Sequence, residues 1–108
     1  MTDESEGALL FEVITPLGFK VHCYQDYWQR KVVAAHPVMQ GRVEDVKRAL
    51  TEPEEVRLSR TDVEVYLFYG LAEKRLVCAV ARKAGEDGFL ITAYPADRMK
   101  DGTTVWTK

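Results

Sequence analysis

The sequence contains few of the residues that most often build metal or redox sites. Its 108 residues include two cysteines, Cys23 and Cys78, and two histidines, His22 and His36, and these four residues lack the spacing of metal ligands. We therefore predict that the protein needs no metal and no other cofactor. Because each cysteine lies in an apolar, strand-like run, both are expected to be buried, reduced thiols, with a single disulfide between them as the alternative.

Several common functional motifs are also missing. The chain has no glycine-rich nucleotide or phosphate loop, no HExxH zinc motif, no GxSxG nucleophile motif and no EF-hand loop. The formal net charge is −2, so no overall cationic field attracts nucleic acid, and any site for a polyanion must be a local patch. These absences argue against most of the enzyme classes that short motifs identify.

Long apolar runs are absent too. No run approaches the roughly 18 residues that a membrane-spanning helix needs. The first residues, "MTDESEGA", are acidic and polar, unlike a signal peptide. We therefore expect a cytoplasmic protein with no membrane partner, in which residues 1–7 are a disordered lead and residues 8–108 form a single domain.

The spacing of apolar residues changes along the chain and predicts the order of the elements. Residues 9–24 form two extended runs around a Pro-Leu-Gly turn, which predicts a β-hairpin. Apolar residues then recur at helical spacing, which predicts helices over 26–35 and 38–51, separated at Pro37.

The part of the chain after Pro53 is rich in β-branched and aromatic residues, with short turns between the runs. It predicts antiparallel strands over 54–59, 63–71, 74–84 and 88–94, with 101–107 as a candidate edge strand. The run over 74–84 is apolar on both faces, so we expect it in the middle of the sheet. The predicted fold class is α+β: an N-terminal β-hairpin, two helices, then an antiparallel sheet of about four strands with the helices packed on one face.

Two polar residues near the end of the last long strand are the first candidates for a site. Thr92 and Tyr94, in "ITAYP", have the same strand parity as Leu90 and the opposite parity to Phe89. If the helices cover the side of Phe89, Thr92 and Tyr94 stand on the open side of the sheet. There a hydroxyl could hold a phosphate oxygen, and a phenol could stack on a base or act as an acid.

His36 and a pair of basic residues are further candidates. His36 lies at the end of the first predicted helix, where the helix dipole favours a cation, and capping of helix carbonyls is the alternative role. Arg82 and Lys83 close the central strand, and because adjacent strand residues point to opposite faces, only one of them can face a given site. A solvated strand end is the alternative interpretation.

Three remaining candidates lie on the neighbouring strand and its loop. Tyr69 is at a strand end, and Ser59 and Arg60 are in the loop before that strand. The alternative for the loop is an ordinary Ser/Thr or Asx turn.

Four segments together resemble a known group of proteins. The "HP" at the start of a helix, "LTEPEEVRLSRTD", "VEVYLFYG" and above all "ITAYP" are similar to phage-associated members of the barnase–EndoU–colicin–RelE-like nuclease group. The resemblance covers residues from about 11 to 106, and it implies the same order of helices followed by a four-stranded antiparallel sheet.

The resemblance implies a metal-independent ribonuclease. In such enzymes the ribose 2′-hydroxyl attacks the adjacent phosphate and leaves a cyclic phosphate and a 5′-hydroxyl. The resemblance implies that His36 is the acid or base and that Arg82 or Lys83 holds the phosphate. It also implies that Thr92 and Tyr94 line the sheet face.

The same resemblance implies RNA as substrate, a toxin or phage-derived effector as biological type, and a protein antitoxin or immunity protein as partner. A catalytically silent binding or interaction module on the same fold, pairing with a protein through an exposed edge strand, is the alternative.

Overall fold

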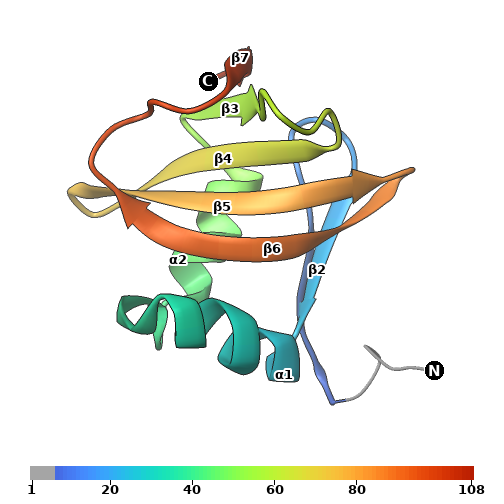
Figure 1. Cartoon of the computed structure of the whole chain (residues 1–108), viewed down its shortest axis with the longest axis vertical. Helices are drawn as coiled ribbons and strands as arrows, with labels where there is room; N and C mark the ends of the chain where they lie inside the picture. Colours follow the sequence, from blue (N-terminus) through green and yellow to red (C-terminus); the bar gives the residue numbers. More distant parts are fainter. Residues whose placement is uncertain (1–6) are drawn as a thin grey trace.

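The computed structural model describes residues 7–108, which form one seven-stranded sheet with helical segments inserted between its second and third strands (Figure 1). The predicted disordered lead therefore lies outside the described residues, apart from Gly7. In chain order the strands are β1 (Leu9–Ile14), β2 (Lys20–Tyr24), β3 (Glu55–Leu58), β4 (Val65–Ala72), β5 (Arg75–Ala84), β6 (Asp87–Ala96) and β7 (Thr103–Thr107). The helical segments are α1 (Gln25–Tyr27), η1 (Trp28–Val33), η2 (Pro37–Met39) and α2 (Val43–Thr51).

The predicted fold class is wrong. The structure is mostly sheet, with seven strands in the order β1-β2-β6-β5-β4-β3-β7 and only two short helical regions. The sheet is mixed, because β2 and β6 pair in parallel while the other neighbours are antiparallel. The predicted hairpin forms, but it joins the main sheet through the pairing of His22 with Phe89, and β7 extends the other side by pairing with β3. Both pairings join segments far apart in sequence, so no local sequence pattern predicts them.

The two helical regions fall where the apolar spacing predicts, with different internal geometry. The first runs from residue 25 to residue 35, but its centre, η1, is a π-helix. The second was predicted from residue 38, whereas η2 is a 3-10 turn and α2 begins at Val43. Gly41 explains the difference, because its φ of +80° is a left-handed conformation that a helix does not continue through.

The two helical regions contact different strands of the sheet. The segment from α1 to η2 contacts the sheet through β6, whereas α2 packs on β4 and β5, where Figure 1 shows it behind the strands. Gly70 on β4 makes that packing close, because a β-carbon placed there would lie 2.6 Å from the Cα of Ala49 on α2. Glycine is the residue that lets a helix backbone approach a strand so closely.

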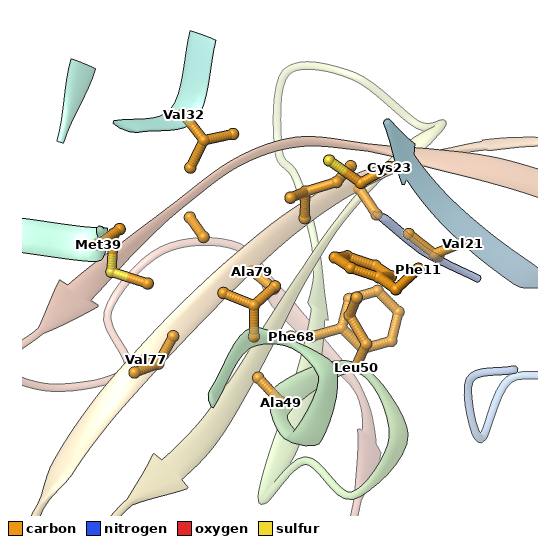
Figure 2. Packing of buried hydrophobic residues seen from close by; sticks show 14 of the residues in the cluster. Phe11, Val21, Cys23, Val32, Met39, Ala49, Leu50, Phe68, Val77 and Ala79 are labelled. Atoms are coloured by element: carbon orange, nitrogen blue, oxygen red, sulfur yellow. The ribbon is translucent and has the colours of Figure 1, made fainter. Parts of the chain in front are cut away.

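The main core lies between these helical segments and the sheet. Figure 2 shows side chains from the hairpin, the helices and the central strands meeting in one cluster, among them Phe11, Val32, Leu50 and Phe68. As predicted, β5 is the central strand. Val77, Ala79 and Ala81 lie in this main core, and Cys78 belongs to a smaller buried cluster on the opposite face. We call that opposite face, which the helices leave uncovered, the open face.

No helix in residues 7–108 combines the length and the apolar character required to cross a membrane.

Candidate functional site

A β-bulge in β6 decides which of its side chains reach the open face. Val80 on β5 pairs with Thr92, but the next residue, Ala81, pairs with Leu90, so Ile91 is an extra residue on β6. Leu90 therefore lies in the main core, and the prediction that it shares a face with Thr92 and Tyr94 is wrong. Bulges redirect side chains in this way because they reverse the strand alternation on one side of the extra residue.

Thr92 and Tyr94 line a groove on the open face, with a volume of about 450 Å³. We call it the Tyr94 groove. It is lined by Ser59, Arg60, Thr61, Val65, Leu67, Val80, Thr92, Tyr94, Asp101 and Gly102. Three aliphatic side chains from β4 and β5 contribute an apolar surface, while hydroxyl groups and two charged residues come from the surrounding segments. Four of the residues that the sequence singled out (Ser59, Arg60, Thr92 and Tyr94) are therefore brought together.

Two loops form walls of the Tyr94 groove, residues 59–64 before β4 and residues 97–102 after β6. Arg60 joins them, since its Nη2 donates a hydrogen bond of 3.3 Å to the carbonyl of Gly102. Within the first loop, the Thr61 N–H donates to Ser59 Oγ at 3.2 Å. This hydrogen bond forms a Ser/Thr turn, which was the alternative interpretation of the loop. Ser59 therefore both shapes the turn and lines the groove.

A row of tyrosine, thiol and tyrosine crosses the open face beside the groove. Tyr69 on β4 pairs with Cys78 on β5, which pairs with Tyr94 on β6, so the three side chains lie next to one another. Burial raises the pKa of Cys78 to about 11, and burial is also the main cause that raises the pKa of Tyr94 and of Tyr69 above their ordinary range. All three groups are therefore neutral near pH 7.

The two cysteines are free and buried, in agreement with the predicted reduced thiols. Cys23 lies in the main core on β2 and Cys78 on the open face of β5, so the sheet separates them.

His36 contacts the row at its end. Pro37 follows it, and the backbone of His36 leaves helical geometry with φ −137° and ψ 80°, as predicted. The imidazole packs on the phenol of Tyr94, with ring centroids 5.4 Å apart and an interplanar angle of 45°. His36 does not itself line the groove but touches the tyrosine that does.

Thr92 adds an unsatisfied polar atom. Its Oγ1 is buried and has no hydrogen-bond partner within residues 7–108. Buried hydroxyls are nearly always paired, so an unpaired one beside a groove calls for an explanation.

The remaining predicted residues do not line the groove. Lys83 points to the helix-covered side, where its Nζ lies 5.9 Å from the centre of the Phe19 ring. Arg82 lies on the open side, but its guanidinium contacts Asp62 at 2.7 Å and Glu64 at 3.0 Å. Tyr69 is buried under the face, with the Arg57 guanidinium 5.9 Å from its ring centre.

The sequence did not point to Thr61, Asp101, Gly102 or the aliphatic surface of the groove. Asp101 and Gly102 reach the groove because the loop after β6 folds back over the open face. Gly102 is needed there, since its φ is +86° and a β-carbon would lie 2.7 Å from the carbonyl of Leu58. The "DG" pair was a visible turn signal, but it gave no indication of what the turn would cover.

In the part of the chain that the structure describes, no three His, Cys, Asp or Glu side chains are grouped to hold a metal ion. Comparison with protein-family models, with curated proteins and with solved structures finds no match for this chain.

Proposed function

We propose that the protein is a metal-independent ribonuclease that binds single-stranded RNA in the Tyr94 groove. The observation that carries the proposal is the convergence of separate segments. Ser59 and Arg60 come from one loop, Thr92 and Tyr94 come from β6, and His36 reaches Tyr94 from the end of the first helical region. These residues are up to 58 positions apart in the chain (94 minus 36); four of them line the groove, and His36 contacts Tyr94 beside it.

The groove offers the groups that binding of RNA requires. A volume of about 450 Å³ is of the order of a drug-sized ligand site and accommodates a nucleoside. The Tyr94 ring and the aliphatic surface provide a platform for a base, because stacking is tolerant of sequence. The hydroxyls of Ser59 and Thr61 and the guanidinium of Arg60 can hold phosphate oxygens. A substrate oxygen near Thr92 would also give its unpaired Oγ1 a partner after a small local movement.

The proposed chemistry is attack of the ribose 2′-hydroxyl on the adjacent phosphate. His36 takes the proton of the 2′-hydroxyl as general base while water or the Tyr94 phenol gives a proton to the leaving 5′-oxygen; in the reverse assignment His36 protonates the 5′-oxygen and water accepts the proton of the 2′-hydroxyl. Arg60 stabilises the charge that builds up on the phosphate oxygens. Tyr94 is protonated near pH 7, because burial raises the pKa of its phenol, so it can donate a hydrogen bond but cannot serve as a base.

One observation favours the alternative of a catalytically silent interaction module. Arg60 is the sole cation lining the groove among the described residues, and Asp101 lines the same groove with a negative charge. A site without net positive charge binds RNA poorly, since phosphate contacts supply much of the affinity. A silent module would still use the groove to bind a partner, but would consume no RNA.

The two readings are separated by an assay of RNA cleavage in excess EDTA. Wild-type protein and the His36→Asn variant are incubated with labelled RNA, beside His22→Asn, which removes the only other histidine of the chain. We expect cleavage by wild type and His22→Asn, a loss of at least about a hundredfold in His36→Asn, and products with 5′-hydroxyl ends. A DNA strand of the same sequence should stay intact, because it lacks the attacking 2′-hydroxyl. RNA that stays intact at high protein concentration contradicts the proposal.

A further inference from the structure

Arg82 holds a loop of the groove from outside it. It lies two residues beyond Val80 on β5 and directly opposite Val65 on β4, and both of these valines line the Tyr94 groove. Its Nη2 contacts Asp62 at 2.7 Å, and its Nη1 contacts Glu64 at 3.0 Å. Both carboxylates belong to loop 59–64.

The same loop delivers three side chains to the groove, those of Ser59, Arg60 and Thr61. Its shape is fixed internally, because Asp62 Oδ1 also accepts a hydrogen bond of 3.0 Å from the Glu64 N–H. On the far side it is tied to Gly102 through Arg60. Side chains therefore hold the loop at two points, through Arg82 at one end and Arg60 at the other, in addition to backbone hydrogen bonds that include Lys83 N–H to the Glu64 carbonyl.

We propose that Arg82 is a positioning residue that fixes loop 59–64 as a wall of the Tyr94 groove and so sets RNA affinity without contacting RNA. This inference rests on the proposed function and assigns Arg82 a different role from the direct phosphate contact that its sequence position suggested.

The charges around Arg82 support this role. Two carboxylates face one guanidinium, so the cluster carries a net charge of −1 and does not attract a phosphate. A phosphate that bound Arg82 directly would have to displace at least one carboxylate from a charge-assisted contact. Exposed ion pairs contribute little to global stability, so loss of these contacts should disorder the loop rather than unfold the protein.

The test compares Arg82→Gln, the double variant Asp62→Asn/Glu64→Gln, and the triple variant that combines them. RNA affinity is measured by fluorescence anisotropy with a labelled single-stranded oligonucleotide in excess EDTA. Lys83→Gln controls for the lost positive charge, and Glu44→Gln/Glu52→Gln, on and just after α2, controls for two lost negative charges. We expect Arg82→Gln and the double variant each to weaken binding at least about threefold relative to their controls, and the triple variant to weaken it no further.

A direct phosphate contact gives the opposite pattern. Removing Asp62 and Glu64 as partners would then free Arg82 and tighten binding beyond the charge control, and that result overturns the proposal. Arg82→Lys should retain more affinity than Arg82→Gln, because one ammonium can still contact a carboxylate of the loop.

A second readout keeps the inference separate from the proposed function. Amide hydrogen exchange at Thr61 and Glu64, whose N–H groups are bonded within the loop, should become at least about tenfold faster in Arg82→Gln while core amides stay protected. Unchanged exchange there overturns the positioning role. If wild type binds no RNA, the proposed function fails, whereas faster exchange in the loop still supports the role of Arg82 in shaping the groove.

Discussion

The two cysteines allow a quantitative prediction about the open face, because Cys78 lies in the row with Tyr69 and Tyr94. Burial raises the pKa of Cys78 to about 11 and that of Cys23 to about 12, whereas the ordinary value is 9.0. Thiol reagents attack the thiolate, so the fraction of thiolate limits the rate. At about pH 8, an ordinary cysteine is roughly one-tenth thiolate, while a thiol with a pKa of about 11 is roughly one-thousandth thiolate.

Ionisation alone therefore slows Cys78 by about a hundredfold and Cys23 by about a thousandfold. Exclusion of the reagent by packing slows both further, since Cys78 is fully buried and Cys23 is 3% exposed. The order of reactivity is predicted to be free cysteine, then Cys78, then Cys23.

The assay follows the reaction of native protein with a chromogenic disulfide reagent, with protein unfolded in denaturant as the reference. The Cys23→Ala variant isolates the signal of Cys78. Two thiols should titrate in denaturant, and both should react at least about a hundredfold more slowly in the native state. Rapid native reaction of either thiol, or titration of fewer than two thiols after unfolding without reductant, would refute the burial and the reduced state described above.

Three further predictions concern stability and association. Gly70→Ala should lower the free energy of unfolding by about 1–3 kcal/mol, because the new methyl group would collide with Ala49 on α2, and urea denaturation measures the loss. The pKa values of Tyr69 and Tyr94 are raised above 10.0, so their contribution to stability is intact below pH 10 and is lost as the pH rises further. The urea denaturation midpoint of wild type should fall above pH 10, and it should fall less in Tyr94→Phe. A wild-type midpoint that stays constant, or an equal fall in the two proteins, would count against the burial of Tyr69 and Tyr94. Finally, the edge strands β1 and β7 each contain a β-bulge, and bulges protect sheet edges from pairing with another chain. Light scattering should therefore give the same molecular mass for wild type and for the edge variant Val105→Lys. A wild-type dimer that Val105→Lys converts to monomer would contradict this.

The local elements were predictable because they have local causes. Strands β3 to β6 and both helical regions lie where the spacing of apolar residues places them, and the Pro-Leu-Gly turn joins β1 to β2. The central position of β5 followed from its two apolar faces. The fold class was not predictable in the same way, because it depends on the pairings of β2 with β6 and of β3 with β7, which join residues distant in sequence.

The candidate site likewise combines features that the sequence predicts with features that depend on the fold. Ser59, Arg60, Thr92 and Tyr94 were each identifiable as polar residues at strand ends or in turns, and the structure gathers them in one groove. Their common location could not be derived, since it depends on the bulge at Ile91 and on two loops folding over the open face. The sequence also does not show which of Arg82 and Lys83 faces the groove. Adjacent strand residues point to opposite faces, and the sequence does not tell which face the helices cover.

The ion-pair partners of Arg82 show most clearly what the sequence alone does not predict. An arginine at a strand end is compatible with a phosphate site, a solvated end or a structural ion pair. Only the fold shows that Asp62 and Glu64, at 20 and 18 positions before it, lie within contact distance.

The most direct test of the proposed function is cleavage of labelled single-stranded RNA by purified protein in excess EDTA, with His36→Asn and His22→Asn beside wild type. We expect cleavage by wild type and by His22→Asn, little or none by His36→Asn, and products that carry a cyclic phosphate and a 5′-hydroxyl. Intact RNA with all three proteins, or equal cleavage by all three, would contradict it.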